Sequence, residues 1–187
     1  MPVLIVIIIF VFIAVWAMNL YNNLVRLRNN RQKVFADIDV QLRQRHDLVP
    51  QLVETVKGYA GHERELLLKI TEARSGAVSA TTIDDKIKAE EQLSKVLQGL
   101  NVRAEAYPDL KANQNFLRLQ EQLNEIENKL ADIRRLFNAA TTEYNTAVES
   151  FPSNLVANNF DFKREVMFDI GTQEVRKQIE EVPVVKF

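Results

Sequence analysis

The chain opens with an uninterrupted apolar run, and this run constrains the fold more than any other feature. Every residue from 3 to 18 is apolar, Leu20 and Tyr21 extend the run, and the first charged side chain is Arg26. An α-helix of about 19 residues rises roughly 28 Å, close to the ~30 Å thickness of bilayer hydrocarbon. The sequence therefore predicts one transmembrane helix, with residues 1–21 as a membrane anchor.

The aromatic residues of the run indicate where it leaves the membrane. Trp16 and Tyr21 lie near its C-terminal end, and amphipathic rings prefer the headgroup level. The residues expected to form the membrane anchor include Val3, Ile7, Phe10, Ile13, Trp16 and Tyr21.

A cleaved signal peptide is the alternative interpretation of the same run. Val15 and Ala17 would form a weak cleavage site before Met18. A signal peptide carries Lys or Arg ahead of its apolar core, whereas only Met1 and Pro2 precede this one. We therefore favour a retained anchor.

The charges that follow the run predict the orientation of the anchor. Arg26, Arg28, Arg31 and Lys33 come before the first acidic residue, Asp37. The positive-inside rule then places the C-terminal body in the cytoplasm and the N-terminus outside. We expect a single-pass protein of the cell (inner) membrane, with the lipid bilayer as a partner.

The composition of the chain excludes several classes of function. Lys and Arg number 24 against 25 Asp and Glu, so the net charge of −1 does not favour a nucleic-acid partner. There is no cysteine, which excludes disulfides and thiolate chemistry. Gly and Pro number only five each, as expected of a chain built from long helices.

Apolar residues at three- and four-residue spacing predict the helices of the body. The first helix should run from about residue 3 to Gly58, with a kink where Pro50 frees the carbonyl of His46. Whether this helix continues through Gly58 into a second one is left open. Its apolar stripe comprises Leu20, Leu24, Leu27, Arg31, Val34, Ile38, Leu48, Leu52 and Tyr59.

Two further helices are predicted, over residues 61–77 and 83–106, and a small polar loop over residues 75–82 joins them. Pro108 then suits the first turn of the next helix. The expected buried residues of the two helices are Leu66, Leu67, Ile70 and Ala73, and Ile83, Ile87, Leu93, Leu97, Leu100 and Ala104.

The longest pattern is an apolar seam of about five heptads, which predicts a long helix. It comprises Phe116, Leu119, Leu123, Ile126, Leu130, Ile133, Phe137, Ala140, Tyr144, Val148 and Phe151. Such a seam packs equally well within one chain or against a neighbour, so both remain open.

These patterns together predict an all-α fold, in which the N-terminal transmembrane helix continues into an antiparallel bundle of about four helices with long first and last members. The predicted divisions are the anchor over residues 1–21, a cytoplasmic helical bundle over 22–152 and an irregular C-terminal tail over 153–187. The tail includes a short helix near 172–181 and an apolar end.

Residues with catalytic potential are few. His62 and Glu63 begin a His-Glu-x-x-His pattern, but position 66 is Leu, and His46 is the only other histidine. We expect no metal site, and interpret the pair as capping a helix N-terminus. We predict no catalytic, cofactor-binding or metal-binding residue and no cofactor.

One charged run allows a second interpretation. A buried acid-base cluster is one possibility, but Asp39 and Arg43 are spaced as an ordinary ion pair on a helix surface. Some of these charges would instead fix the register of a bundle if they met Glu127 or Arg134. The run comprises Asp39, Arg43, Arg45, His46 and Asp47.

Asparagines recur along the last long helix and its exit, where they lower helix propensity. They are interpreted either as caps and solvated positions or as buried residues that specify pairing. They are Asn113, Asn115, Asn138, Asn145 and Asn154.

Several sequence blocks, in this order, resemble the LemA family of bacterial membrane proteins over residues 20–155. Phe137 stands where the family more often has Tyr, and nothing is carried over for residues 166–177. The blocks are Ile-Asp-Val-Gln-Leu at 38–42, Asp-Leu-Val-Pro-Gln-Leu-Val at 47–53, Lys-Gly-Tyr-Ala at 57–60, His-Glu at 62–63, Tyr-Pro-Asp-Leu-Lys-Ala-Asn at 107–113, Asn-Phe at 115–116, Tyr-Asn at 144–145 and Phe-Pro-Ser-Asn-Leu at 151–155.

The resemblance implies an outward N-terminus, a cytoplasmic antiparallel bundle and no established catalytic residues; a magnetosome member of the family is linked to membrane remodelling. We expect a non-enzymatic scaffold, a homo-oligomer that organises or remodels membrane. The alternative is an adaptor that presents its bundle or tail to a membrane protease or signalling complex. Residues expected to serve packing or assembly are Leu27, Val34, Ile38, Leu48, Pro50, Leu52, Leu119, Leu123, Ile126, Leu130, Ile133, Phe137 and Tyr144.

Overall fold

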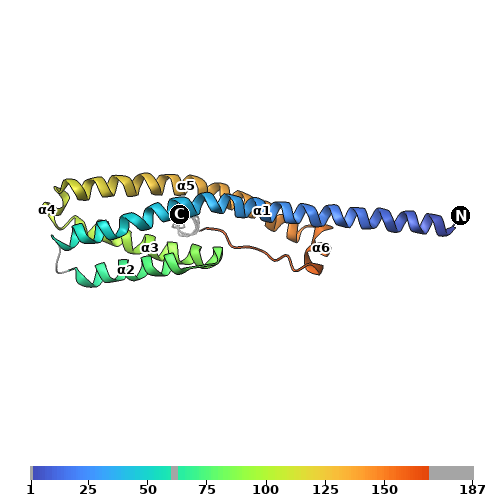
Figure 1. Cartoon of the computed structure of the whole chain (residues 1–187), viewed down its shortest axis with the longest axis horizontal. Helices are drawn as coiled ribbons and strands as arrows, with labels where there is room; N and C mark the ends of the chain where they lie inside the picture. Colours follow the sequence, from blue (N-terminus) through green and yellow to red (C-terminus); the bar gives the residue numbers. More distant parts are fainter. Residues whose placement is uncertain (1, 60–62, 169–187) are drawn as a thin grey trace, which may run out of the picture. The chain divides into compact units, whose positions relative to one another are not determined.

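The computed structural model describes residues 2–59 and 63–168, and this part of the chain contains helices and no strand (Figure 1). The all-α fold predicted from the sequence is confirmed, with two long helices, α1 and α5. The helices are α1 (Pro2–Lys57), α2 (Arg64–Ser79), α3 (Ile83–Ala104), α4 (Pro108–Lys111), α5 (Gln114–Glu149) and α6 (Ser153–Asn159).

The described chain forms two compact units. Residues 37–133 make up the first, which we call the bundle unit, and residues 2–36 and 134–168 make up the second, which we call the anchor unit. Helices α1 and α5 contribute to both, because each crosses a boundary between the units.

Helix α1 contains Pro50 in its interior and ends at Lys57, before Gly58. Proline cannot donate to the carbonyl four residues earlier, which here belongs to His46. That carbonyl accepts a hydrogen bond of 2.7 Å from Nε of Arg74 on α2. A side chain of α2 therefore satisfies the backbone carbonyl that the proline leaves free. Helix α2 begins at Arg64, so it is a separate helix from α1.

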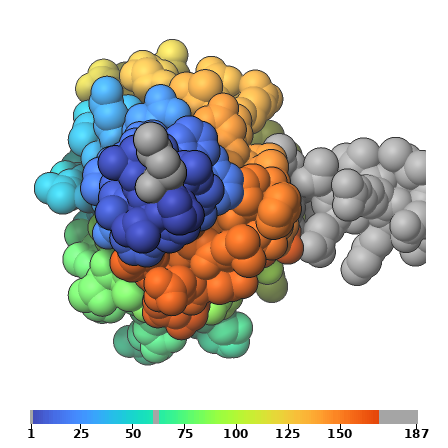
Figure 2. All heavy atoms as spheres, turned by 90° about the vertical axis from the view of Figure 1, so that its right-hand side faces the viewer, coloured from blue at the N-terminus to red at the C-terminus, as the bar shows by residue number. Residues whose placement is uncertain are grey.

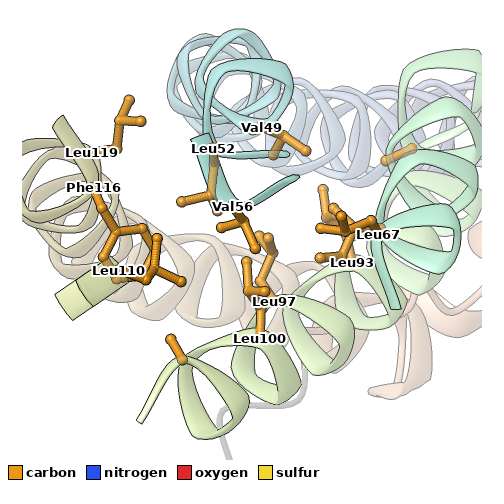
Figure 3. Close-up of a cluster of buried hydrophobic side chains, with 13 residues drawn as sticks. Val49, Leu52, Val56, Leu67, Leu93, Leu97, Leu100, Leu110, Phe116 and Leu119 are labelled. Atoms are coloured by element: carbon orange, nitrogen blue, oxygen red, sulfur yellow. The ribbon is translucent and has the colours of Figure 1, made fainter. Parts of the chain in front are cut away.

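Four long helical segments share the core of the bundle unit (Figure 3). Each contributes one apolar stripe to it, as helix amphipathicity predicts, and the short α4 adds Leu110. The buried residues are Val49, Leu52, Val56, Leu67, Ile70, Ala77, Leu93, Leu97, Leu100, Ala104, Leu110, Phe116 and Leu119.

The predicted loop over residues 75–82 is wrong in most of its length. Helix α2 continues to Ser79, and only residues 80–82 separate it from α3. Burial of Ala77 in the core holds this last turn helical despite its small polar neighbours. Thr82 caps α3 by accepting a 3.1 Å hydrogen bond from the backbone N–H of Asp85.

The seam of α5 is buried or half-buried from Phe116 to Val148. Phe151 is the exception: it lies beyond the last helical residue, Glu149, and its side chain is exposed. At the other end, Asn113 accepts a 3.0 Å hydrogen bond from the backbone N–H of Phe116 and so caps the helix.

In the anchor unit, the end of α5 and the helix α6 pack against α1. Leu24 of α1 shares an apolar cluster with Tyr144, Val148, Ala157 and Phe162. A second cluster joins three aromatic rings, whose centroids are 5.6 Å apart for Phe35 and Phe137, 5.5 Å for Phe137 and Phe168, and 6.4 Å for Phe35 and Phe168.

Helix α6 corrects the prediction that irregular chain begins at residue 153. Oγ of Ser153 donates to the carbonyls of Ala147 and Ser150, at 2.5 and 2.9 Å. At the other end Asp161 has φ 56°, and the N–H of Phe162 donates to the carbonyl of Ala157 at 2.9 Å. This is the hydrogen bond of a Schellman cap, so tertiary contacts and caps form a helix without a clear sequence signal. The predicted helix near 172–181 and the apolar end of the tail lie outside the described residues.

Candidate functional site

The strongest concentration of ionisable groups lies in the interior of the bundle unit. Arg45 and Glu90 are each 1% exposed, and His46 is buried beside them. Arg45 stands between Leu42 and Val49 on the inward stripe of α1, and Glu90 takes the equivalent place on α3. Both helices therefore place a charge where their pattern calls for an apolar residue.

The charged groups of this cluster contact one another and two further side chains. The guanidinium of Arg45 contacts Oε2 of Glu90 at 3.1 Å, Oγ of Ser94 at 2.9 Å and Oε1 of Glu127 on α5 at 3.0 Å. The other oxygen of Glu90 lies 2.5 Å from Nε2 of His46. One arginine thus joins three helices, since a planar guanidinium presents its donors in a fixed fork.

A second ion pair group borders the cluster. Asp39 binds Arg43 one turn along α1 at 2.8 Å and Lys86 on α3. Burial alone would raise the pKa of Asp39, but hydrogen bonds from Lys86 and Arg43 outweigh it and lower the pKa. Asp39, His46, Lys86 and Glu90 line a cavity of about 270 Å³.

The chemistry available at this cluster is restricted by its own ion pairs. Both oxygens of Glu90 are engaged, and the cavity is lined by groups that already bind one another. Among the described residues, no three His, Asp or Glu side chains are grouped as metal ligands would be. The arrangement suits a role in fixing the register of α1, α3 and α5.

The predicted meeting of the charged run with Glu127 is confirmed for Arg45, and the surface pair of Asp39 with Arg43 is also confirmed. Glu90 was missed by the sequence analysis. Its signal is available in hindsight: an acid interrupts the apolar stripe of one helix and a base interrupts that of another.

A second constellation lies in the anchor unit, where residues 163–168, which we call the strap, run along α5. Asn145 donates to the carbonyl of Glu165 at 2.9 Å and accepts from its N–H at 2.8 Å. Asn138 makes the same two hydrogen bonds with Phe168, both at 2.9 Å. Each side-chain amide therefore binds the strap as a neighbouring strand would.

The spacing of these contacts explains their register. Asn138 and Asn145 are seven residues apart on a helix, a rise of about 10.5 Å. Glu165 and Phe168 are three residues apart in extended chain, a rise of about 10 Å. Asn145 is thus a buried asparagine that binds a distant segment, Asn138 is half-buried and binds the same segment, and Asn113 is a cap. That they specify pairing stays a prediction.

Arg31 fastens the strap from α1. It is 3% exposed and donates to the carbonyl of Val166 at 3.0 Å and to Oγ1 of Thr141 at 3.2 Å, while its ion pair with Glu165 measures 3.1 Å. Its guanidinium also lies 4.8 Å from the ring centre of Phe137. The arginine placed on the apolar stripe by the sequence analysis is therefore a bridge between α1, α5 and the strap.

The residues predicted to serve packing or assembly lie mostly inside this chain. Ile38, Leu52, Leu119, Ile126, Leu130, Phe137 and Tyr144 are buried, Leu27, Val34, Leu48, Leu123 and Ile133 are half-buried, and Pro50 is exposed. The seam therefore packs against the chain's own helices, and a role for these residues in assembly stays a prediction.

The expected capping by His62 and Glu63 is wrong for Glu63. Its carboxylate makes no capping hydrogen bond to α2 and instead contacts Arg103 and the hydroxyl of Tyr107, both at 3.2 Å. The two donors on α3 and its exit occupy the carboxylate oxygen that would otherwise be available to cap α2. His62 lies outside the described residues.

Within the described chain, α1 alone contains a stretch long and apolar enough to cross a membrane. None of that stretch is buried. Of the predicted membrane-anchor residues, Tyr21 is half-buried, and Val3, Ile7, Phe10, Ile13 and Trp16 are exposed. The helix fits a membrane anchor.

Comparison with known proteins gives a consistent result. A family model described as the LemA family matches residues 34–187. The chain is 27% identical to protein LemA of Metamycoplasma hominis, covering 83% of this chain and 75% of the relative. It is 25% identical to magnetosome protein MamQ 2 of Paramagnetospirillum magneticum, covering 84% and 67%, and 23% identical to magnetosome protein MamQ of Magnetospirillum gryphiswaldense, covering 79% and 64%.

Proposed function

Because the chain belongs to the LemA family, we propose that it acts as a membrane-anchored helical scaffold without enzymatic activity, whose copies associate to organise or remodel a patch of membrane. It spans the cell (inner) membrane once, with the N-terminus outside and the body in the cytoplasm. The bilayer and further copies of the chain are its partners.

The observation that carries this proposal is the continuity of α1. One helix, Pro2–Lys57, contains both the apolar stretch and residues of the bundle core, such as Val49 and Leu52. No Gly or Pro lies between Pro2 and Pro50, so the sequence has no helix breaker in this part of α1. A membrane helix continuous with its body suits a protein that organises the bilayer around it.

The interior charges support a structural role over a catalytic one. Arg45, Glu90 and Arg31 are all buried, and each is held by ion pairs and hydrogen bonds to its own chain. Catalytic acids and bases need a reachable proton site near a substrate. These internal pairs instead specify how the helices pack.

The relatives support the membrane part of the proposal. Two of them are named as magnetosome proteins. This chain covers 67% of the first and 64% of the second.

Because the seam of α5 is buried within the chain, the copies would associate through the outer faces of the long helices. Val40 on α1 and Leu117 and Leu136 on α5 are apolar and at least half exposed. Leu68 on α2 is similarly exposed and provides a matched position away from both long helices.

The test is the mass of the full-length protein in mild detergent and in native lipid extracts, measured by mass photometry. We expect assemblies that Leu117→Lys and Leu136→Lys shift toward smaller masses, while Leu68→Lys does not. A monomer at every concentration would overturn the scaffold and favour the adaptor, whose partners would then be sought with and without the tail.

A further inference from the structure

The anchor unit places α6 at the depth where the apolar stretch of α1 ends. On α1, every residue from Pro2 to Trp16 is exposed, whereas Ala17, Leu20 and Tyr21 are half-buried and Leu24 is buried. Residues at this spacing lie on one face of a helix. Tyr21 and Leu24 pack in the apolar cluster that contains Ala157 of α6. Contacts from the rest of the unit therefore begin inside the predicted membrane span.

The lengths of these stretches decide where the membrane surface falls. The exposed part of α1, about 15 residues, rises only about 22 Å, against roughly 30 Å of hydrocarbon. The whole apolar run, to Tyr21, rises roughly 28 Å. A bilayer that covers the whole run therefore also covers part of whatever lies beside residues 17–21.

The outer surface of α6 has the composition that such a depth requires. Phe151, Leu155 and Phe160 are 79%, 60% and 57% exposed, and the ring of Phe160 meets that of Tyr21 edge-on at 4.8 Å. No charged residue lies between Glu149 and Asp161. Figure 2 looks along α1 from its N-terminal end, and this last described part of the chain, in orange, spreads beside the blue helix and faces the viewer.

Charged residues return on both sides of this segment, and they occur in pairs. Arg164 binds Glu149 at 3.4 Å, and Lys163 binds Asp161 at 3.0 Å. Four basic residues of α1, from Arg26 to Lys33, begin about one turn beyond Tyr21. The uncharged segment is thus bounded by groups that belong in the headgroup layer or in water.

We infer that residues 150–160, centred on α6, form a second membrane contact, an interfacial wedge whose exposed apolar side chains insert into the lipid leaflet at the C-terminal end of the span. Its occupant is lipid, because the surface continues the apolar surface of the anchor without a charged break. A wedge in one leaflet increases the cross-sectional area of the protein in that leaflet alone, which favours curvature of the bilayer. In this point the inference rests on the proposed remodelling function, for which it supplies a physical cause.

The absence of cysteine allows a clean test with single spin labels on the full-length chain. Phe151→Cys and Leu155→Cys are labelled, and the protein is reconstituted into vesicles of phosphatidylcholine with a minority of phosphatidylglycerol. Leu136→Cys is the control: it is 63% exposed, and its neighbour Phe137 packs against Phe35, about 21 Å further along α1 than Tyr21.

The accessibility of each label to oxygen and to a water-soluble nickel chelate reports its depth. We expect the ratio of oxygen to nickel collisions at positions 151 and 155 to exceed that at position 136 several-fold. Equal, water-like ratios at all three positions would overturn the wedge. Labels shielded from both reagents, with spin broadening that grows with protein density, would also overturn it, because a second copy would then cover α6. Because Leu136 is also a proposed self-association position, the ratios are compared at protein densities where no label shows spin broadening, so that failure of the wedge is distinguished from failure of self-association.

Discussion

Removal of Glu90 should destabilise the bundle unit more than loss of any exposed charge. Glu90→Leu leaves the Arg45 guanidinium, 1% exposed, without its buried carboxylate, and His46 without its partner at 2.5 Å. Breaking a buried ion pair from one side costs about 3–5 kcal/mol, because the remaining charge stays desolvated. This is a large fraction of the stability of a small helical protein.

Replacement of both charges should cost much less than replacement of one. Arg45→Met with Glu90→Leu fills the same space with apolar groups, and such exchanges are often neutral. Ser94 and Glu127, which also bind Arg45, are not buried and regain water. His46 still loses its Glu90 partner, so the double variant should lie about 1–3 kcal/mol below the wild type, well short of the sum of the two single losses.

The assay is urea unfolding of full-length protein in detergent, followed by the far-ultraviolet signal, with hydrogen exchange to assign the loss to residues 37–133. The reasoning is refuted if Glu90→Leu costs less than about 1 kcal/mol, or if the two single losses add in the double variant.

Three further outcomes are expected. Asn145→Ala removes both hydrogen bonds that hold Glu165, so the strap should gain hydrogen exchange and tryptic cleavage, at a cost of about 1–3 kcal/mol; unchanged protection would contradict its role. The pKa of Asp39 lies below its ordinary 3.8 in the folded chain, so its carboxylate stabilises the fold above about pH 4, and this contribution is lost as the pH falls further. In acid, the free energy of unfolding of Asp39→Asn should therefore fall less steeply with decreasing pH than that of the wild type. Equal slopes would contradict this role. Phe137→Ala should lower the free energy of unfolding in urea by about 3–5 kcal/mol, whereas Leu136→Ala, at the exposed neighbouring position, should change it very little. Similar losses in the two variants would contradict the packing of Phe137.

The helices were largely predictable because their apolar periodicity is long and regular. The seam from Phe116 to Val148 and the extent of α1 follow directly from it. The end of α2 was predicted too early, since Ser75 and Gly76 look like loop residues and only the burial of Ala77 keeps the turn helical. Local sequence alone carries no information about that burial.

The functional contacts were harder to predict because each joins segments far apart in the chain. Arg45 and Glu90 interrupt two separate stripes, and one sequence does not show that the interruptions face each other. Asn138 and Asn145 act on a strap 20–30 residues away that has no periodicity of its own. Helix α6 is held by caps and by contacts with α1, so it left no pattern that could be recognised.

The central claim, self-association in the membrane, is tested most directly by counting chains in single vesicles. The exposed Ser75 is replaced in Ser75→Cys, the only thiol in the chain, and carries one dye. Photobleaching steps are counted at low protein-to-lipid ratios, where chance co-occupancy is rare. The scaffold predicts several steps per spot, in a distribution that stays fixed as the protein is diluted. Single steps at every dilution would contradict it.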